Sequence, residues 1–276
     1  MSFITLAREL GSISEAEVVR LSELLGMDCI GKEFVEKRFE EIGMPTDSLR
    51  EYDEKRPGFF ARLFRGEPDH YLDTLRNILY FEVQKDNKLI VGRGANFLFA
   101  GIPNCLRVKL VASKETRLKN IMEWEGCTMQ VAQEMIDKSD RDRAGFCLFH
   151  YNEDWYAANS YDVVVKTDTL TLETLAPFLL CAMKSIMTRE RDEQGQKLLD
   201  DKMLVNRIVF RLREQECLPL RFLVVESNNG KVVLNGLAMS EIVSQRAAEV
   251  AASVDGVVSV LNQLKIMTHP LPRRVV

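Results

Sequence analysis

The feature that most constrains the fold is an alternation of short apolar runs with helical segments through the first 187 residues. The runs have the length and β-prone composition of buried strands, and the segments between them repeat apolar residues at helical spacing. Strands that alternate with helices predict right-handed crossovers and a parallel sheet with helices on both faces. We expect strands at residues 3–6, 89–91, 106–111 and 162–165, and helices at residues 15–25, 32–42, 71–83, 114–125, 128–137 and 170–187.

The pattern changes after "TRERDEQGQK", residues 188–197, whose polar composition is typical of a linker or an exposed helix end. Beyond it, "NNG" at 228–230 lies between two apolar runs and predicts a hairpin. The expected order is a helix at 198–212, strands at 221–226 and 231–235, a helix at 239–253 and a strand at 257–266. We therefore predict an α/β domain at 1–187, a linker at 188–197, a small α+β (αββαβ) domain at 198–268 and a tail at 269–276.

Length and composition limit the class of protein. The 276 residues, 46% hydrophobic and 28% charged, suit a soluble protein of about two domains. No apolar run approaches the roughly 20 residues of a membrane helix, and "MSFITLARELGS" lacks the features of a signal peptide. We expect a cytoplasmic protein with no transmembrane segment. The net charge of −4 gives no support for nucleic-acid binding.

The six cysteines are scattered without a C-x-x-C pair. This spacing favours reduced thiols over a disulfide framework or a zinc site, so no metal site is expected. We expect most of these cysteines in the core.

The first strand leads through Gly11 into a helix, the arrangement of a phosphate-binding loop. In the motif G-x-x-x-x-G-K-[ST], backbone N–H groups surround a phosphate and the lysine reaches it. Counted from Gly11, Ala16 takes the place of the second glycine and Glu17 that of the lysine. Ile13 adds a β-branched side chain where glycine would allow close approach. The loop therefore has an acid where a cation is needed.

The same residues offer the helix another way to satisfy its first turn. Ser12 with Glu15, and Ser14 with Glu17, both have the spacing of a capping box. A γ-phosphate near Glu15 would meet repulsion of about 1–4 kcal/mol, depending on screening. We expect weak or absent ATP binding here, unless Arg8 or a more distant arginine compensates.

Arg93 directly follows a buried strand, at the carboxyl edge of a parallel sheet where ligands of α/β proteins bind. A guanidinium suits bidentate phosphate binding. Gly92 and Gly94 beside it favour either close ligand approach or a plain turn. The alternative for Arg93 is packing over the sheet edge.

A basic stretch follows the predicted helix 128–137. It contains Lys138, Arg141 and Arg143, interleaved with Asp140 and Asp142. Such a run is either a solvated, self-paired surface or a cationic lid over phosphates. Arg117, on the helix after the third expected strand, either supports the lid or pairs with Glu115 or Glu123.

A mixture of basic and aromatic residues lies between 44 and 88, in "EKRPGFFARLFRGEPDHY". It could recognise a base and its phosphate, or form an amphipathic helix that covers a groove; we favour the helix. The residues concerned are Lys55, Arg56, Arg62, Arg65, Phe59, Phe60 and Phe64.

Four segments taken in order resemble the cytidylate kinase-like family of nucleoside monophosphate kinases. They are "ITLARELGS", "LIVGRGANFLF", "CLRVKLVASKETRLKNIMEWEG" and "DKSDRDRAGFCLFHYNEDWYAANSYDVVVKTDTLTLE". The resemblance implies a P-loop kinase-like parallel sheet flanked by helices. It also implies phosphoryl transfer from ATP with Mg²⁺ to a nucleoside monophosphate, for which CMP is a candidate.

The resemblance also implies roles for individual residues. Arg93 would hold the acceptor phosphate, Arg141 and Arg143 would act on the transferred group, and Arg117 with Lys138 would support the lid. The nucleotide loop would be formed by Arg8, Gly11, Ser12 and Ser14.

The C-terminal region resembles a BON domain, through "VVLNGLAMSEIVSQRAAEVAASVDGVVSVLNQLKI". This resemblance implies docking to a protein partner or to phospholipid, without catalytic residues. Two hypotheses follow: a cytidylate kinase-like phosphotransferase, or a catalytically inactive kinase-fold protein that binds a nucleotide and docks through its second domain.

Overall fold

The computed structural model describes residues 2–42, 70–85 and 87–267. Contacts divide the chain into two compact units, residues 1–195 and 196–276. The basic and aromatic residues from Lys55 to Arg65 lie outside the described residues, as does the predicted tail at 269–276.

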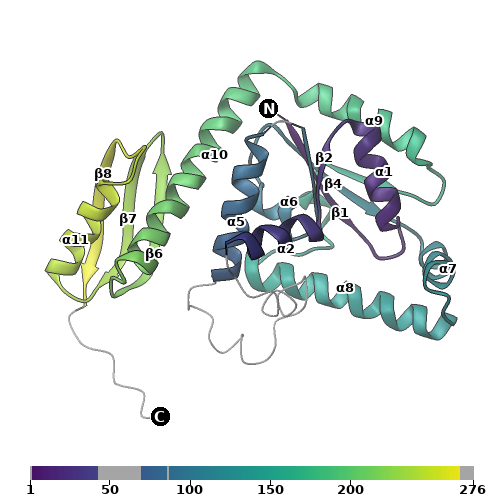
Figure 1. Cartoon of the computed structure of the whole chain (residues 1–276), viewed down its shortest axis with the longest axis horizontal. Helices are drawn as coiled ribbons and strands as arrows, with labels where there is room; N and C mark the ends of the chain where they lie inside the picture. Colours follow the sequence, from purple (N-terminus) through teal and green to yellow (C-terminus); the bar gives the residue numbers. More distant parts are fainter. Residues whose placement is uncertain (1, 43–69, 86, 268–276) are drawn as a thin grey trace, which may run out of the picture. The chain divides into compact units, whose positions relative to one another are not determined.

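A five-stranded parallel sheet forms the centre of the first unit (Figure 1). Its strands pair in the order β2-β3-β1-β4-β5, and Ile4 of β1 lies between Leu89 of β3 and Leu106 of β4. β2 was not expected, because three residues are too few to show a period. The strands are β1 (Phe3–Arg8), β2 (Asp28–Ile30), β3 (Lys88–Val91), β4 (Cys105–Val111) and β5 (Val163–Lys166).

The helices of this unit follow the predicted spacing, with one large difference. α8 continues to Tyr151, whereas the charged run after residue 137 had suggested an earlier end. Ile136, Phe146 and Cys147 are buried, so the buried stripe of α8 continues past the charges. The helices are α1 (Glu15–Leu25), α2 (Lys32–Glu41), α5 (His70–Val83), α6 (Ala95–Leu98), α7 (Lys114–Glu125), α8 (Met129–Tyr151) and α9 (Leu172–Ile186).

Alternation along β1 sends its side chains to two cores. Ile4 and Leu6 lie in a cluster with Leu21 of α1 and Leu179 of α9, which cover one face. On the other face, the ring of Phe3 lies 4.8 Å from that of Phe99, which lies 5.6 Å from the ring of Tyr80 on α5. Both faces are therefore covered by helices, as a parallel sheet requires.

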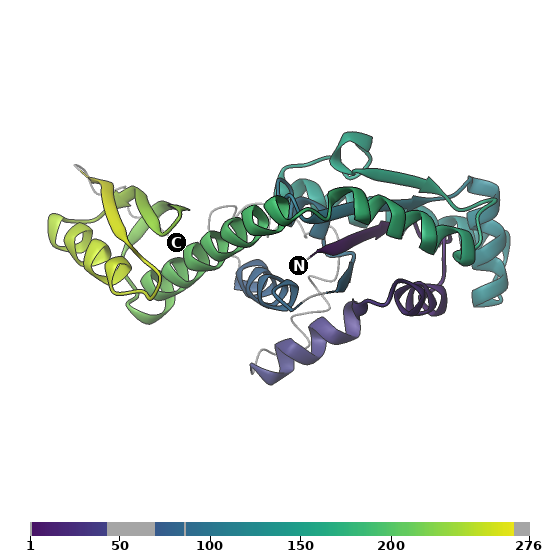
Figure 2. The same cartoon turned by 90° about the horizontal axis from the view of Figure 1, so that it is seen from above.

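The second unit has the predicted αββαβ order. β6 pairs antiparallel with β7, and β7 pairs parallel with β8. In Figure 2 the strands and the second helix of this unit have the yellow-green to yellow colours of the end of the chain. α10 begins at Arg189, so most of the polar stretch predicted as a linker is helical. The elements are α10 (Arg189–Phe210), a π-helical turn (Arg211–Gln215), β6 (Leu220–Asn228), β7 (Lys231–Ala238), α11 (Glu241–Ala252) and β8 (Ser259–Ile266).

One carboxylate fixes the hairpin of this unit. Asp201 of α10 accepts hydrogen bonds from the backbone N–H of Asn229 at 2.7 Å and of Gly230 at 3.0 Å. The predicted Asn-Gly turn is therefore stabilised by hydrogen bonds to α10 in addition to its own backbone geometry.

All six cysteines are free thiols, but the expectation that most lie in the core is wrong. Cys105 and Cys147 are buried, while Cys181 and Cys217 are exposed. Among the described residues, no helix has the length and apolar character needed to cross a membrane.

Candidate functional site

The loop between β1 and α1, residues 9–14, is held by its carbonyl groups. Each carbonyl from residue 9 to residue 13 accepts a hydrogen bond from a side chain. The donors lie on the loop itself, on β1, on α7 and just after β5. The bonds are Ser12 Oγ to Glu9 O (2.7 Å), Arg117 Nε to Leu10 O (2.7 Å), Asn120 Nδ2 to Gly11 O (2.9 Å), Thr167 Oγ1 to Ser12 O (2.9 Å) and Arg8 Nη1 to Ile13 O (2.6 Å).

The first turn of α1 is capped from within. Ser14 Oγ accepts from the N–H of Glu17 at 3.2 Å, and the N–H of Ser14 donates to the Glu17 carboxylate at 2.7 Å. The predicted Ser14–Glu17 capping box is confirmed. The Ser12–Glu15 box is wrong, because the helix begins at Glu15 and the Ser12 hydroxyl donates to Glu9 O instead.

Arg8 is the last residue of β1, and its side chain is 11% exposed. Besides its bond to Ile13 O, its guanidinium forms an ion pair with Glu15, whose side chain is 84% exposed. The cation nearest to the loop in sequence is therefore paired with a carboxylate of the first turn of α1.

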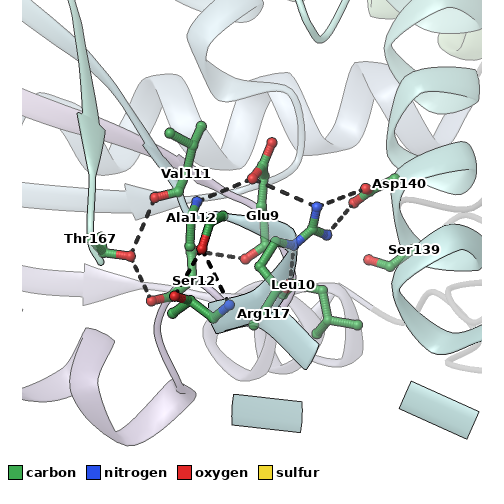
Figure 3. A network of polar contacts seen from close by, with 12 residues as sticks. Glu9, Leu10, Ser12, Val111, Ala112, Arg117, Ser139, Asp140 and Thr167 are labelled. Atoms are coloured by element: carbon green, nitrogen blue, oxygen red, sulfur yellow. Dashed lines mark hydrogen bonds and ion pairs between the residues drawn. The ribbon is translucent and has the colours of Figure 1, made fainter. Parts of the chain in front are cut away.

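Arg117 joins the loop to α8 (Figure 3). Its Nη1 and Nη2 atoms donate to the two carboxylate oxygens of Asp140, at 3.0 and 2.7 Å. Its Nη1 also lies 3.6 Å from Glu9, whose carboxylate accepts from the N–H of Ala112 at 3.3 Å. Arg117 therefore pairs with Asp140 and Glu9 rather than with Glu115 or Glu123.

Gly11 is required by this packing. Its φ is +87°, and a Cβ atom there would lie 2.8 Å from the carbonyl oxygen of Arg117. The loop glycine therefore lets the loop approach the backbone of α7.

The loop residues do not fit a triphosphate. Ile13 is 3% exposed and belongs to the core cluster with Val18 and Leu21, so its side chain is built into the fold. Ser12 and Ser14 use their hydroxyls in internal bonds, and Glu15 adds negative charge to the first turn. Among the described residues, no group of three His, Cys, Asp or Glu side chains is placed to hold a metal ion.

A cavity of about 810 Å³ lies beside this loop, at the carboxyl ends of β1, β2 and β3. It is bounded by α1, α2 and α8. Its lining residues are Arg8, Leu10, Glu15, Val18, Val19, Cys29, Gly31, Lys32, Glu33, Phe34, Val91, Gly92, Arg93, Met135, Lys138, Ser139, Asp142 and Arg143.

Arg93 lies in this cavity on a turn of unusual conformation. Gly92, Arg93 and Gly94 have φ values of +72°, +58° and +64°. A Cβ on Gly94 would lie 2.4 Å from the ring of Tyr151, whose hydroxyl donates to Arg93 O at 3.2 Å. Arg93 is 3% exposed. A left-handed arginine is uncommon and costs free energy, so the surrounding contacts hold it in place.

α8 contributes some of the predicted basic residues to the cavity. Lys138 and Arg143 line it, and Arg143 donates to Ser139 Oγ. Arg141 is exposed and is not among the lining residues. The stretch that was expected to follow a helix lies within one. The lining residues Met135, Ser139 and Asp142 follow one another at intervals of four and three residues, and Arg141 lies outside this face.

The cavity combines positive charge with an apolar wall. Its cations are Arg8, Lys32, Arg93, Lys138 and Arg143, against the carboxylates Glu15, Glu33 and Asp142. Phe34, Val19 and Met135 form apolar surface. Burial, reinforced by the charge of Glu15, raises the pKa of the Cys29 thiol, so this cysteine is a neutral group in the wall. The arrangement suits an anion attached to a flat apolar group.

Lys109 is a buried cation that the sequence did not reveal. Its ammonium donates to Trp155 O at 2.8 Å and lies 4.0 Å from the centroid of the Trp155 ring, with the rings of Tyr161 and Tyr156 slightly farther away. Burial lowers the pKa of Lys109. Since the lysine is on β4, it holds the segment that follows α8 against the sheet.

Two regions of the chain match known families. Residues 3–169 match the cytidylate kinase-like family, and residues 200–268 match the BON domain. A cytidylate kinase of Thermoplasma volcanium is 23% identical over 189 residues, which cover 68% of this chain and 94% of that protein.

One solved structure shares the fold of the first unit, and a kinase superimposes less well. An uncharacterized protein from Eubacterium ventriosum superimposes with a TM-score of 0.51 at 19% identity, covering 67% of this chain and 99% of its own. A shikimate kinase from Bacteroides thetaiotaomicron has a TM-score of 0.40 at 14% identity, covering 66% of this chain and 98% of its own. With its parallel sheet and the match over residues 3–169, the chain belongs to the cytidylate kinase-like family and carries a C-terminal BON domain.

Proposed function

We propose that this protein binds a nucleoside monophosphate in the cavity beside α8, and that it does so without using loop 9–14 to hold ATP. The observation that supports this most is the placement of Arg93. A buried guanidinium on a left-handed turn is already positioned before any ligand binds. Such preorganisation reduces the free energy lost in ordering a binding residue.

The chemistry of the walls supports a monophosphate of a nucleoside. Arg93 and Arg143 offer planar donors to a phosphate, while Phe34, with Arg38 over its ring, adds aromatic surface for a base. The match to the cytidylate kinase-like family makes CMP the first nucleotide to test.

Phosphoryl transfer is the less supported alternative. In a P-loop kinase, the loop cradles the donor and a lysine reaches its phosphates. Here the N–H groups of Ser12 and Ser14 donate to Glu9 O and to the Glu17 carboxylate. Ile13 is in the core, and Glu15 lines the cavity. These contacts support a protein whose cavity binds the acceptor nucleotide of a kinase and whose loop 9–14 does not bind the donor nucleotide.

Calorimetric titration of the full chain with AMP, CMP, GMP and UMP, and separately with ATP and Mg²⁺, tests the proposal. We expect one monophosphate to bind, ATP not to bind, and Arg93→Ala to abolish the binding of the monophosphate. Arg20→Ala is the matched control, because Arg20 is exposed on α1 and pairs with Glu23. Turnover of ATP with a monophosphate at ordinary kinase rates, lost in Arg93→Ala, would refute the binding-protein proposal. Binding of ATP created by Ile13→Gly with Glu15→Lys would support the account of the loop.

For the second unit, we propose docking to a protein partner. Three exposed apolar residues lie on β6 and where β7 leads into α11: Phe222 (76% exposed), Met239 (46%) and Ile242 (79%). Phe222 has a φ of +52° beside a bulge in β6, so the strand turns this ring outward. A photo-crosslinking group at residue 242 should capture one defined protein in cells, and Phe222→Ser should remove that product. Sedimentation of the full chain with phosphatidylglycerol vesicles, lost in the same variant, would instead favour phospholipid.

A further inference from the structure

We infer that Tyr151, the last residue of α8, is a positioning residue that holds Arg93 in place for the ligand phosphate. The inference rests on the proposed binding of a nucleoside monophosphate and adds a residue to it. Tyr151 is not among the residues that line the main cavity, so its effect on the ligand passes through Arg93.

The turn that carries Arg93 needs support from its surroundings. Gly92, Arg93 and Gly94 all have positive φ values, which glycine adopts readily. Arg93 has a Cβ atom, so its left-handed conformation costs free energy that neighbouring contacts must offset. Without such contacts, the turn would relax toward negative φ and carry the guanidinium away from its present place.

Tyr151 contacts the turn at two points. Its hydroxyl donates to Arg93 O at 3.2 Å, and this bond lasts only while the ψ angle of Arg93 keeps the carbonyl directed at the donor. Its ring packs against the next residue, where a Cβ atom on Gly94 would lie 2.4 Å from the ring atom Cε2. The two contacts together fix the peptide group that joins Arg93 to Gly94.

Both ends of this arrangement are anchored. The ring of Tyr151 lies 5.8 Å from the ring of Phe97 on α6, measured between centroids. At the start of the turn, the N–H of Gly92 donates to Leu6 O of β1 at 3.0 Å. Arg93 therefore lies between a contact to the sheet on one side and a contact to α8 on the other.

The same helix supplies other cations of the cavity. Lys138 and Arg143 line the main cavity from α8, whereas Arg93 lines it from the turn after β3. The Tyr151 hydroxyl connects the two supports and so helps to set the distance between the two guanidinium groups. A phosphate that both groups bind gains affinity when they are in place beforehand, because ordering them on binding costs free energy.

Tyr151→Phe tests this inference, because it keeps the ring and removes only the hydroxyl. In calorimetric titrations of the full chain with CMP and the other monophosphates, we expect binding about threefold to tenfold weaker than in the wild type, the effect of losing one neutral hydrogen bond. Tyr161→Phe is the matched control, since the Tyr161 hydroxyl donates to Trp155 O at 2.9 Å. Its affinity should stay near the wild-type value.

NMR of arginine Nε–H groups in the ligand-free protein separates positioning from a general effect on the fold. In the wild type, we expect the Nε–H group of Arg93 to be as rigid as that of Arg117, which donates to Leu10 O. In Tyr151→Phe, the order parameter of Arg93 should fall while that of Arg117 stays unchanged. Arg93→Lys assigns the signal, because lysine has no Nε–H group.

Equal affinities of the wild type and Tyr151→Phe, or an Arg93 that stays rigid in the variant, would overturn the positioning role and leave the proposed function standing. A loss of order at Arg93 and Arg117 together, with a lower melting temperature, would also overturn it, since Tyr151 would then support the fold as a whole. If the wild type bound no monophosphate, both proposals would be overturned.

Discussion

Arg117 of α7 and Asp140 of α8 form a two-pronged ion pair, with N–O distances of 3.0 and 2.7 Å. The Arg117 side chain is 9% exposed and that of Asp140 is 18% exposed. Because Arg117 also donates to Leu10 O, one guanidinium connects the loop after β1 to the helix that lines the cavity.

Asp140→Asn should therefore destabilise the protein. Removing one partner leaves a nearly buried guanidinium poorly compensated, and we expect a loss of about 1–3 kcal/mol in the free energy of unfolding. Urea denaturation measures this loss. Asp137→Asn on the same helix is the control, since Asp137 is exposed and accepts a hydrogen bond from Gln133 on the helix surface. Equal stabilities of the two variants would contradict the assigned role of Arg117.

Ile13→Ala should cost about 2–4 kcal/mol, because truncating a buried isoleucine leaves a cavity in the core. A residue that merely covered a phosphate site would tolerate this change. Thermal or urea unfolding distinguishes the two, with Ile42→Ala as the control at a position that is 57% exposed. A change within about 0.5 kcal/mol for both variants would show that Ile13 is not part of the core.

Glu15→Gln should strengthen monophosphate binding by about threefold to tenfold at low salt, since it removes a negative charge from the cavity and releases Arg8 from its ion pair. Titration at two salt concentrations measures the gain and its screening. Glu17→Gln changes the same helical turn but only its capping box, so it should lower stability without this gain. An unchanged affinity in Glu15→Gln would mean that Arg8 is not available to the ligand.

Arg143→Ala should weaken monophosphate binding by at least about tenfold, whereas Arg141→Ala should leave it near the wild-type value. Both arginines lie on α8, but only Arg143 lines the cavity. Comparable losses in the two variants would support the role of Arg141 that the family resemblance implied.

Asp168 should make stability depend on pH in the acid range. Its carboxylate accepts from the hydroxyl of Ser113, from Thr116 Oγ1 at 2.8 Å and from the N–H of Ser113 at 3.0 Å, and these bonds lower its pKa to about 2. The unfolded value is about 3.9. Because the folded state favours the charged form, the contribution of Asp168 is fully present above about pH 4 and is lost as the pH falls through about 2.

Urea unfolding of Asp168→Asn at pH 7 and at pH 2.5 measures this effect. The difference from the wild type should shrink at the lower pH. Asp255→Asn, at an exposed position of the second unit, is the control. A difference of constant size at both pH values would show that these hydrogen bonds do not favour the carboxylate.

The sequence predicted most of the fold because its signals are local. The bounds of α1 match the prediction, and the Ser14–Glu17 box was visible because its two residues are three apart. The extension of α8 was missed because charged residues on its exposed side concealed the buried stripe that continues to Phe146.

The ion pairs and hydrogen bonds of the site could not be predicted, since the residues that form them are distant in sequence. Arg117 was expected to pair with Glu115 or Glu123 on its own helix, yet Asp140 is 23 positions away. Lys109 is 46 positions from Trp155. A lysine within a strand gives no indication in the sequence that aromatic rings will surround its ammonium group.

The packing of Ile13 and the pairing of Glu15 also limit how this loop could be redesigned. Ile13→Gly alone would open a void in the core, and Glu15→Lys alone would place a second cation against Arg8. A phosphate cradle at this position therefore requires changes at several residues together, in the core as well as in the loop.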